Sequence, residues 1–223
     1  MPFTIVSIED IDTPLVKLRQ RNRDVKRFSA GAILFGFRPE DPSLPYILLC
    51  QRALIGTDDN GYPKKNSWPN TWECPGGGFE LQDRTLLHTM MREVYEEVGL
   101  EGWCVATRIY RTTFLHKGVP MAKYISIMSF RDKFQCQRLW SNEIQEPSGL
   151  DEKPIHLRAD EHLDYCWVTE EQVQNSLPYD SNNKEQKKLV ILDNNKQIFL
   201  DFFQSLKSCK LNMEHRLPEL PPR

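Results

Sequence analysis

The chain has 223 residues, a length that suits one globular domain with insertions, and its 29 Lys and Arg against 31 Asp and Glu give a net charge of −2. That charge argues against a general affinity for nucleic-acid backbones, and the lack of an uncharged apolar window of about 18 residues excludes a membrane-spanning helix. Six scattered cysteines without a CxxC pair, and an N-terminus without the apolar core of a signal peptide, indicate reduced thiols in a cytoplasmic protein.

The first part of the chain predicts an arm, two strands and a loop. Residues 1–27 are polar and predict an irregular N-terminal arm. Residues 28–37 and 46–52 are apolar, with a loop rich in Pro and Asp between them, and predict two strands. Residues 57–70 are polar and turn-forming, which predicts an inserted exposed loop or a short hairpin.

An amphipathic helix follows this loop. A short strand at residues 71–74 leads through Pro75 and three glycines to the helix, which we expect to begin near Asp83 as N-cap. We expect it to end at Val98, because Gly99 terminates helices well. The apolar face predicted to pack on a sheet consists of Leu86, Leu87, Met90, Met91, Val94, Tyr95 and Val98.

The second half of the chain predicts strands and helices around an insertion. Three strands are expected over residues 104–116, 121–131 and 163–168. Residues 137–160 are charged and turn-rich, which indicates a lid or surface insertion. Thr169 is a predicted cap for a short helix, and a long C-terminal helix is expected over roughly Asn183–Lys207. The tail at 209–223 contains LPELPPR, which cannot continue that helix.

The amphipathic helix also carries three glutamates near its C-terminal end. Glu93, Glu96 and Glu97 have i, i+3 and i+4 spacing, so a helix places them on one face. The helix dipole already puts partial negative charge at this end, and like charges at i, i+4 repel by a few tenths of a kcal/mol. A divalent cation would offset both costs, and carboxylate oxygens suit Mg²⁺. The spacing predicts a metal site.

The segment from Gly78 to Leu100 resembles the signature of the Nudix hydrolase family, Gly-x5-Glu-x7-Arg-Glu-apolar-x-Glu-Glu-x-Gly-apolar. The positions that match in register are Gly78, Arg92, Glu93, Val94, Glu96, Glu97, Gly99 and Leu100. The departure is the first acidic position, which holds Arg84, although Asp83 or Glu80 is close enough in sequence to compensate in space. The resemblance extends more loosely over residues 28–175.

This resemblance implies an α/β fold of the Nudix type, an α/β/α sandwich with a mixed β-sheet. We expect a single such domain over residues 28–208, between the arm and the tail. The resemblance also implies a hydrolase that uses Mg²⁺ or Mn²⁺ to cleave a diphosphate bond in a nucleoside diphosphate derivative. The expected partner is thus a small nucleotide-type substrate, with neither nucleic acid nor membrane, and the sequence makes no prediction of the oligomeric state.

Roles within the signature follow position by position from the resemblance. Glu96 and Glu97 match the metal-ligand pair of the family, and Glu93 matches a position that binds metal or acts as a base. The carbonyl of Gly78 offers a further oxygen ligand. Arg92 matches an arginine that orients a glutamate of the motif through a charge-assisted hydrogen bond.

Because Arg84 holds the position of the usual partner, we expect Arg92 to pair with Glu93, Glu96 or Asp83 instead. Outside the signature, some family members place their general base in a later loop, and Glu161 is its predicted counterpart. Arg52 ends a predicted strand and is a candidate to contact a substrate phosphate.

Two alternative functions stay open. An arginine at position 84 could repel a metal ion or pair with Glu96, which would make the chain a catalytically silent Nudix module that binds a nucleotide or a protein partner. Isomerase chemistry on an allylic diphosphate is known on this fold. It would require a placed cysteine and acid, for which Cys74 in WECPGGG is the candidate.

Overall fold

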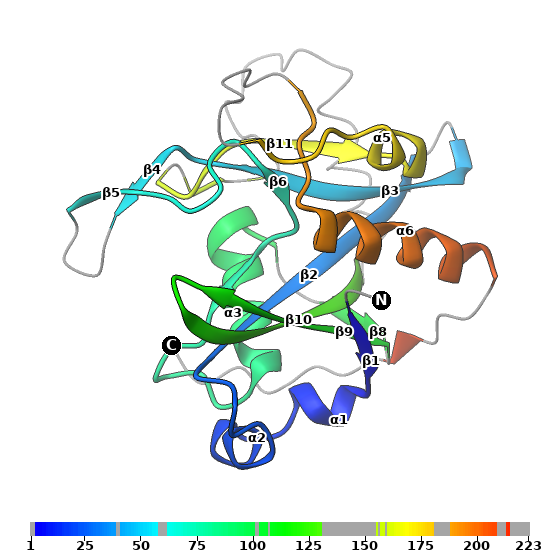
Figure 1. Cartoon of the computed structure of the whole chain (residues 1–223). Coiled ribbons are helices and arrows are strands. Elements are labelled where there is room, and N and C mark those ends of the chain that lie inside the picture. Colours follow the sequence, from blue (N-terminus) through cyan, green and yellow to red (C-terminus); the bar gives the residue numbers. More distant parts are fainter. Residues whose placement is uncertain are drawn as a thin grey trace.

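The computed structural model of the chain describes residues 3–38, 41–57, 62–100, 103–106, 108–130, 155, 157–158, 160–180, 188–208 and 213–214. A large β-sheet runs through the molecule, with helix α3 (Leu86–Val98) behind it and helix α6 (Asp193–Lys207) in front in the view of Figure 1. The described part of the chain contains no helix that combines the length and the apolar character needed to cross a membrane.

The remaining elements are mostly strands. In chain order the strands are β1 (Thr4–Val6), β2 (Arg27–Arg38), β3 (Asp41–Arg52), β4 (Ile55–Thr57), β5 (Pro63–Lys65), β6 (Trp72–Glu73), β7 (Gly76–Gly78), β8 (Trp103–Ala106), β9 (Ile109–His116), β10 (Val119–Phe130), β11 (His162–Val168) and β12 (Met213–Glu214). The short helices are α1 (Ile8–Ile11), α2 (Leu15–Arg21) and α5 (Glu170–Gln174).

The main sheet is mixed, as the resemblance implies. Its strand order is β1-β9-β10-β2-β3-β11, and β6, β7 and β8 pair onto β3, β2 and β10 respectively. The central pair β2–β10 is parallel, whereas the other strand pairs that the structure describes are antiparallel. Strands β4 and β5 form a separate hairpin, which is one of the two alternatives expected for residues 57–70, the other being an exposed loop.

Both faces of strand β2 are buried, because successive side chains of a strand point to opposite faces of the sheet. Ala30, Ala32 and Leu34 belong to the core beneath α3. Ile33 and Phe35 belong to a second core beneath α6, which contributes Phe199, Phe202 and Phe203. A strand that is apolar along nearly its whole length therefore forms the middle layer of the predicted sandwich.

The N-terminal segment corrects one expectation. The described residues of the predicted arm, 3–27, are not irregular, since they include β1, α1 and α2 and the first residue of β2. Ile8 and Ile11, three residues apart on α1, and Leu18 on α2 are buried in the core beneath α3. Their polar neighbours face outward and lower the mean hydropathy of the segment, which is why the sequence pattern indicates an arm. The division of the chain into an arm, a domain over 28–208 and a tail stays a prediction.

The C-terminal helix is shorter than predicted. Helix α6 begins at Asp193, because the residues just before it are used in extended pairing. The carbonyl of Leu189 accepts the N–H of Leu177, and the carbonyl of Val190 accepts the N–H of Trp72. The predicted strand over 104–116 is two strands, β8 and β9. Of the predicted lid, residues 137–154, 156 and 159 lie outside the described residues, as do 181–187 and most of the predicted tail.

Candidate metal centre

Helix α3 positions the glutamates of the signature. It begins after Thr85, whose hydroxyl accepts the backbone N–H of His88 at 3.4 Å, so the predicted N-cap at Asp83 is wrong by two residues. The carboxylate of Asp83 is used elsewhere, as described below. The helix ends at Val98 as predicted, because Gly99 takes the left-handed conformation with φ 71° that glycine adopts without steric cost.

The three glutamates do not share one environment. Glu93 and Glu97 lie one turn apart and are 6% and 3% exposed, whereas the carboxylate of Glu96 lies on the rim of the site with 37% of its side chain exposed. Tyr95, expected in the apolar face, is 43% exposed, so that expectation is wrong. Each residue turns a helix by about 100°, and the inward row therefore passes through Glu93 and Glu97 but misses Glu96 and Tyr95.

The glycines after Pro75 bring the main chain against these carboxylates. A Cβ atom added to Gly76 would lie 2.4 Å from the Cα atom of Gly31. A Cβ atom added to Gly77 would lie 2.4 Å from Oε1 of Glu93. The Gly76 N–H donates to Oε2 of Glu97 at 2.7 Å. Gly78 has open space around it, and its carbonyl accepts a hydrogen bond from Nη2 of Arg92 at 2.9 Å.

Arg92 is the centre of a set of ion pairs that we call the Arg92 network: Arg92, Asp83, Glu80, Glu93 and Glu96. Its guanidinium donates to Asp83 through Nε at 3.1 Å and Nη2 at 3.0 Å, and it lies 3.0 Å from Glu93 and 3.1 Å from Glu96. The expectation that it pairs with Glu93, Glu96 or Asp83 is confirmed for all three acids.

Asp83, next to Arg84 in the sequence, is one of the acids that pair with Arg92. It is buried, and besides Arg92 it accepts hydrogen bonds from the Thr89 hydroxyl at 3.0 Å and the Glu80 N–H at 2.9 Å. The side chain of Arg84 is exposed. Among the described residues Glu96 pairs with Arg92 and Arg158, and not with Arg84 as the silent-module alternative allowed.

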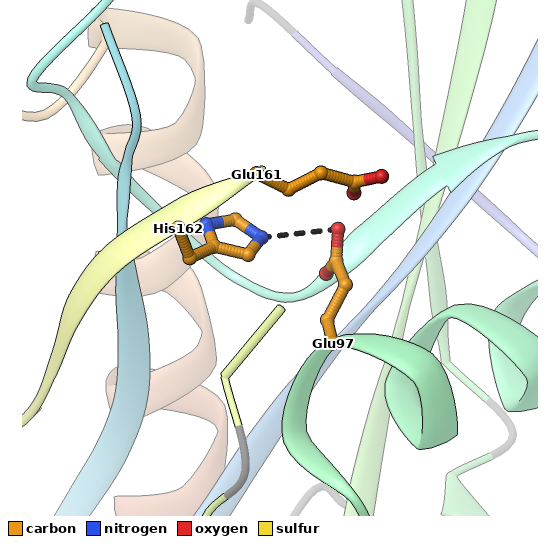
Figure 2. Close-up of side chains that lie close together, drawn as sticks. All are labelled: Glu97, Glu161 and His162. Carbon is orange, nitrogen blue, oxygen red and sulfur yellow. Dashed lines mark ion pairs between the residues drawn. The ribbon is translucent and has the colours of Figure 1, made fainter. Parts of the chain in front are cut away.

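A turn before β11 brings two more titratable side chains to Glu97. The carbonyl of Arg158 accepts the N–H groups of Glu161 at 3.0 Å and His162 at 2.9 Å, and this turn positions both residues at the start of the strand. Figure 2 shows the side chains of Glu161 and His162 converging on Glu97, which rises from the end of α3. We call these three residues the acid cluster; their ligand atoms all lie within 4.8 Å of one another.

The carboxylates in and beside the acid cluster are only partly balanced by the cations that contact them. Nε2 of His162 lies 3.0 Å from Oε1 of Glu97, and Nη1 of Arg158 lies 3.1 Å from Oε1 of Glu161. Burial and the charge of Glu97 raise the pKa of Glu93 to about 8, in spite of Arg92. Burial and Glu97 likewise raise the pKa of Glu161, against the effect of Arg158. Buried oxygens whose negative charge is under-compensated fit a divalent cation.

The carboxylates around His162 favour its protonated form. Burial lowers the pKa of an imidazole, but the neighbouring carboxylate of Glu97, with those of Glu73 and Glu161, outweighs burial and raises the pKa of His162. A positive charge is therefore favoured at this position of the acid cluster.

A second set of charges lies beside the acid cluster on β3, β6 and β10. Glu73 is buried between Arg52, with which it forms a short ion pair, and Lys123, whose Nζ lies 3.5 Å from Oε2. Burial raises the pKa of Glu73, but Arg52, Lys123 and His162 outweigh it and lower the pKa to about 2. Arg52, the predicted phosphate contact, is thus oriented by Glu73 and keeps 31% of its side chain exposed.

Cys74 does not fit an isomerase. Its side chain is fully buried, and burial raises its pKa to about 11. A thiol without solvent access in the core beneath α6 has no path to an allylic substrate. The residue behaves instead as a small apolar side chain.

Sequence reasoning missed His162 and Arg158. The available signal was the adjacency of His162 to Glu161, since an imidazole next to a candidate base in sequence reaches the same site when the chain turns there. Arg158 gave no signal, because an arginine in a charged, turn-rich segment is ordinarily solvated.

Comparison with known proteins identifies a family. The model of the NUDIX domain matches residues 25–190. A comparison with curated proteins gave no significant match. Similar solved structures include a C. elegans Ap4A hydrolase binary complex, with 14% identity, a TM-score of 0.41 and 66% of this chain and 82% of that one covered. Others are the Nudix hydrolase RenU from M. smegmatis (15%, 0.47, 82% and 88%) and the NUDIX domain of Shewanella oneidensis NrtR complexed with ADP ribose (12%, 0.49, 81% and 88%).

Proposed function

The chain belongs to the Nudix family, and on that premise we propose that it is a metal-dependent hydrolase that cleaves a diphosphate bond in a nucleoside diphosphate derivative. The observation that carries the proposal is the acid cluster, in which Glu97 and Glu161 converge from distant parts of the sequence. Glu93, one turn before Glu97, extends the same set of oxygens.

The residues proposed to hold Mg²⁺ or Mn²⁺ are Glu93, Glu96, Glu97 and the carbonyl of Gly78. When bound, such an ion neutralises the diphosphate and lowers the pKa of a water molecule. The protein orients Glu97 through the Gly76 N–H at 2.7 Å and His162 at 3.0 Å, and each contact leaves further lone pairs on the carboxylate. Glu96, exposed at the rim, is free of the packing that fixes Glu93.

Glu161 is the proposed general base. Its Oε1 atom is held by Arg158 at 3.1 Å, which leaves Oε2 to accept the proton of the attacking water. Its carboxylate lies within 4.8 Å of the Glu97 ligand atom, so a water molecule activated beside Glu97 is within its reach.

The positive groups around the acid cluster suit the phosphates of the substrate. Arg158 is exposed and bridges Glu161 and Glu96, with Nη1 3.7 Å from Oε2 of Glu96. Arg52 lies directly opposite His162 in the pairing of β3 with β11. We assign both arginines to phosphate contacts, since a guanidinium matches the geometry of phosphate oxygens.

Support for an active enzyme over a silent module comes from position 84. The charge of Arg84 is exposed, and Asp83 supplies the acid that Arg92 needs. The main reason to suspect an impaired site, a cation in place of an acid, is thereby removed. Arg92 is free to orient Glu93 as the family motif requires.

The test is a screen of the full chain with Mg²⁺ or Mn²⁺ against nucleoside triphosphates, ADP-ribose, NADH, dinucleoside polyphosphates and diphospho-lipids, with products separated by chromatography. We expect metal-dependent release of a nucleoside monophosphate from at least one nucleotide. Glu97→Gln, nearly equal in size, should lose that activity while retaining its thermal unfolding midpoint. A folded protein that cleaves none of these compounds with either metal would overturn the proposal.

A further inference from the structure

His162 has the burial of a core residue and the position of a ligand. Its side chain is 3% exposed, and it lies at the first position of β11, where the pairing with Arg52 of β3 sets the start of the strand. In Figure 2 one edge of the imidazole, carrying Nε2, faces the carboxylate of Glu97, and Glu161 extends alongside. A histidine used only for packing has no reason to direct a ring nitrogen at a buried carboxylate.

The two ring nitrogens of His162 are buried without a conventional hydrogen-bond partner among the described residues. Nε2 lies 3.0 Å from Oε1 of Glu97, but the contact does not have the geometry of a hydrogen bond. A neutral imidazole that carries its proton on Nδ1 directs the lone pair of Nε2 into the acid cluster. Buried polar atoms in native proteins are nearly always satisfied, so an unsatisfied one indicates a missing partner such as an ion.

Distances within the acid cluster suit a shared ion. Ligand atoms on neighbouring positions of an octahedral site with bonds of roughly 2.1 Å lie about 3 Å apart. The separation of 3.0 Å between Nε2 of His162 and Oε1 of Glu97 has this value. The carboxylate of Glu161 lies within 4.8 Å of both ligand atoms, which places it beside a water molecule bound to the same ion.

We propose that His162 is a nitrogen ligand of the divalent cation held by Glu97, and that this ligand makes the site prefer Mn²⁺ to Mg²⁺. The proposal rests on the proposed function for the presence of a cation. Carboxylate and water oxygens suit Mg²⁺ and Mn²⁺ alike, whereas imidazole nitrogen favours first-row transition ions. One nitrogen among oxygens therefore shifts the preference without excluding Mg²⁺.

The competing role for His162 is to hold Glu97 by a hydrogen bond, as residues around metal ligands commonly do. Substitution by glutamine separates the two roles. The side-chain amide of a glutamine at this position reaches about as far as Nε2 and still donates to Glu97, but an amide nitrogen does not bind metals. A positioning role is therefore rescued in His162→Gln, and a ligand role is lost.

The experiment uses the full chain and Mn²⁺ alone, without nucleotide. Pulsed electron paramagnetic resonance detects the ¹⁴N nucleus of a coordinated imidazole, and calorimetric titration measures Mn²⁺ and Mg²⁺ affinity separately. We expect a nitrogen signal in the parent chain that disappears in His162→Gln, with a loss of about tenfold or more in Mn²⁺ affinity and a much smaller loss for Mg²⁺. His116→Gln, which alters a half-buried histidine on β9, is the matched control and should retain the signal.

Absence of a nitrogen signal from the parent chain with bound Mn²⁺ overturns the proposal, whatever the folding of the variants. Unchanged Mn²⁺ and Mg²⁺ affinity in His162→Gln also overturns it in favour of a positioning role, and equal losses of the two affinities overturn the proposed preference for Mn²⁺. The outcome is separate from that of the proposed function. A nitrogen signal from Mn²⁺ bound to a chain that cleaves no diphosphate would support the ligand assignment and overturn the proposed function. Diphosphate cleavage without a nitrogen signal would support the proposed function and overturn the ligand assignment.

Discussion

The Arg92 network and the acid cluster share helix α3 but differ in how their charges are balanced. In the network one guanidinium faces several acids, and although burial opposes its charge, Asp83, Glu93 and Glu80 raise the pKa of Arg92. In the acid cluster, carboxylates face one another, and burial together with their mutual repulsion raises the pKa of Glu161. The Arg92 network favours the ionised form of Arg92, whereas the acid cluster disfavours the ionised form of Glu161.

This difference in charge balance gives the two regions different expected roles, the Arg92 network in stability and the acid cluster in catalysis. Groups whose ionised form is destabilised by their surroundings are common at functional sites, because a cation or a reacting proton relieves the strain. Glu93 joins the two regions: it lies 3.0 Å from Arg92, yet its pKa is raised to about 8 by burial and Glu97. Substitutions in the acid cluster should thus reduce activity first, and those in the network should reduce stability first.

The largest expected effect is on activity, in Glu161→Gln. Removing the proposed base should lower kcat by about 10²- to 10⁴-fold, the usual contribution of general acid–base catalysis. Stability should stay level or rise, because the change removes a carboxylate that is repelled by Glu97. The measurement is kcat on the best nucleotide substrate together with the thermal unfolding midpoint.

Asp164→Asn is the matched control for that prediction. Asp164 is an exposed acid two residues after His162 along β11, and its carboxylate accepts the N–H of Tyr165 at 2.8 Å. We expect its kcat to stay near that of the parent chain. Equal rates in the Glu161 and Asp164 variants would remove Glu161 from the mechanism.

An intermediate effect, now on stability, is expected for Asp83→Asn. The substitution removes the charge that pairs with Arg92 through Nε and Nη2 and places an amide donor against a cation. Breaking a largely buried ion pair from one side should lower the free energy of unfolding by about 2–4 kcal/mol. Activity should fall less than in the Glu161 variant, because the acid cluster itself is intact.

Chemical denaturation of Asp83→Asn and Glu80→Gln distinguishes the buried partner of Arg92 from an exposed one. Glu80 also pairs with Arg92, at 3.5 Å, but 53% of its side chain is exposed. Exposed pairs are screened by water and contribute at most about 1 kcal/mol. A larger loss of stability in Glu80→Gln than in Asp83→Asn would show that the network is organised around a different acid.

Local spacing is the part of this site that sequence reasoning predicts well. Helix α3, its end at Gly99 and the pairing of Arg92 with nearby acids depend on residues within one helix and the loop before it. The strands β2 and β3 follow from apolar runs in the same way. Where local patterns failed, pairing with distant residues decided the structure: residues 189–191 are extended because Leu177 and Trp72 bind them.

The acid cluster is the part that local patterns cannot supply. Glu161 and His162 reach Glu97 only because β11 pairs with β3 and a turn at Arg158 directs both side chains inward. The resemblance predicted Glu161 as the counterpart of the base, but nothing in the residues around it specifies which neighbour also faces the site. The exposure of Tyr95 has a related cause, since the width of the buried helix face depends on what packs against it.

The smallest effect is expected for Arg84→Glu, which restores the family residue at the first acidic position of the signature. Arg84 is exposed, and its described contact with the rest of the chain is made by its backbone carbonyl, which accepts the N–H of Leu15 at 3.4 Å. Asp83 already supplies the acid that Arg92 requires, so a second acid has no partner to gain. We expect a change in kcat below about twofold and a change in unfolding free energy within about 0.5 kcal/mol.

The double variant Asp83→Asn with Arg84→Glu tests whether a glutamate at position 84 can replace Asp83. If it can, the double variant recovers the stability lost in Asp83→Asn. A rise in activity in the single Arg84 variant would mean that the arginine does impair the acid cluster, and the contrast between the two regions would then extend to a charge outside both.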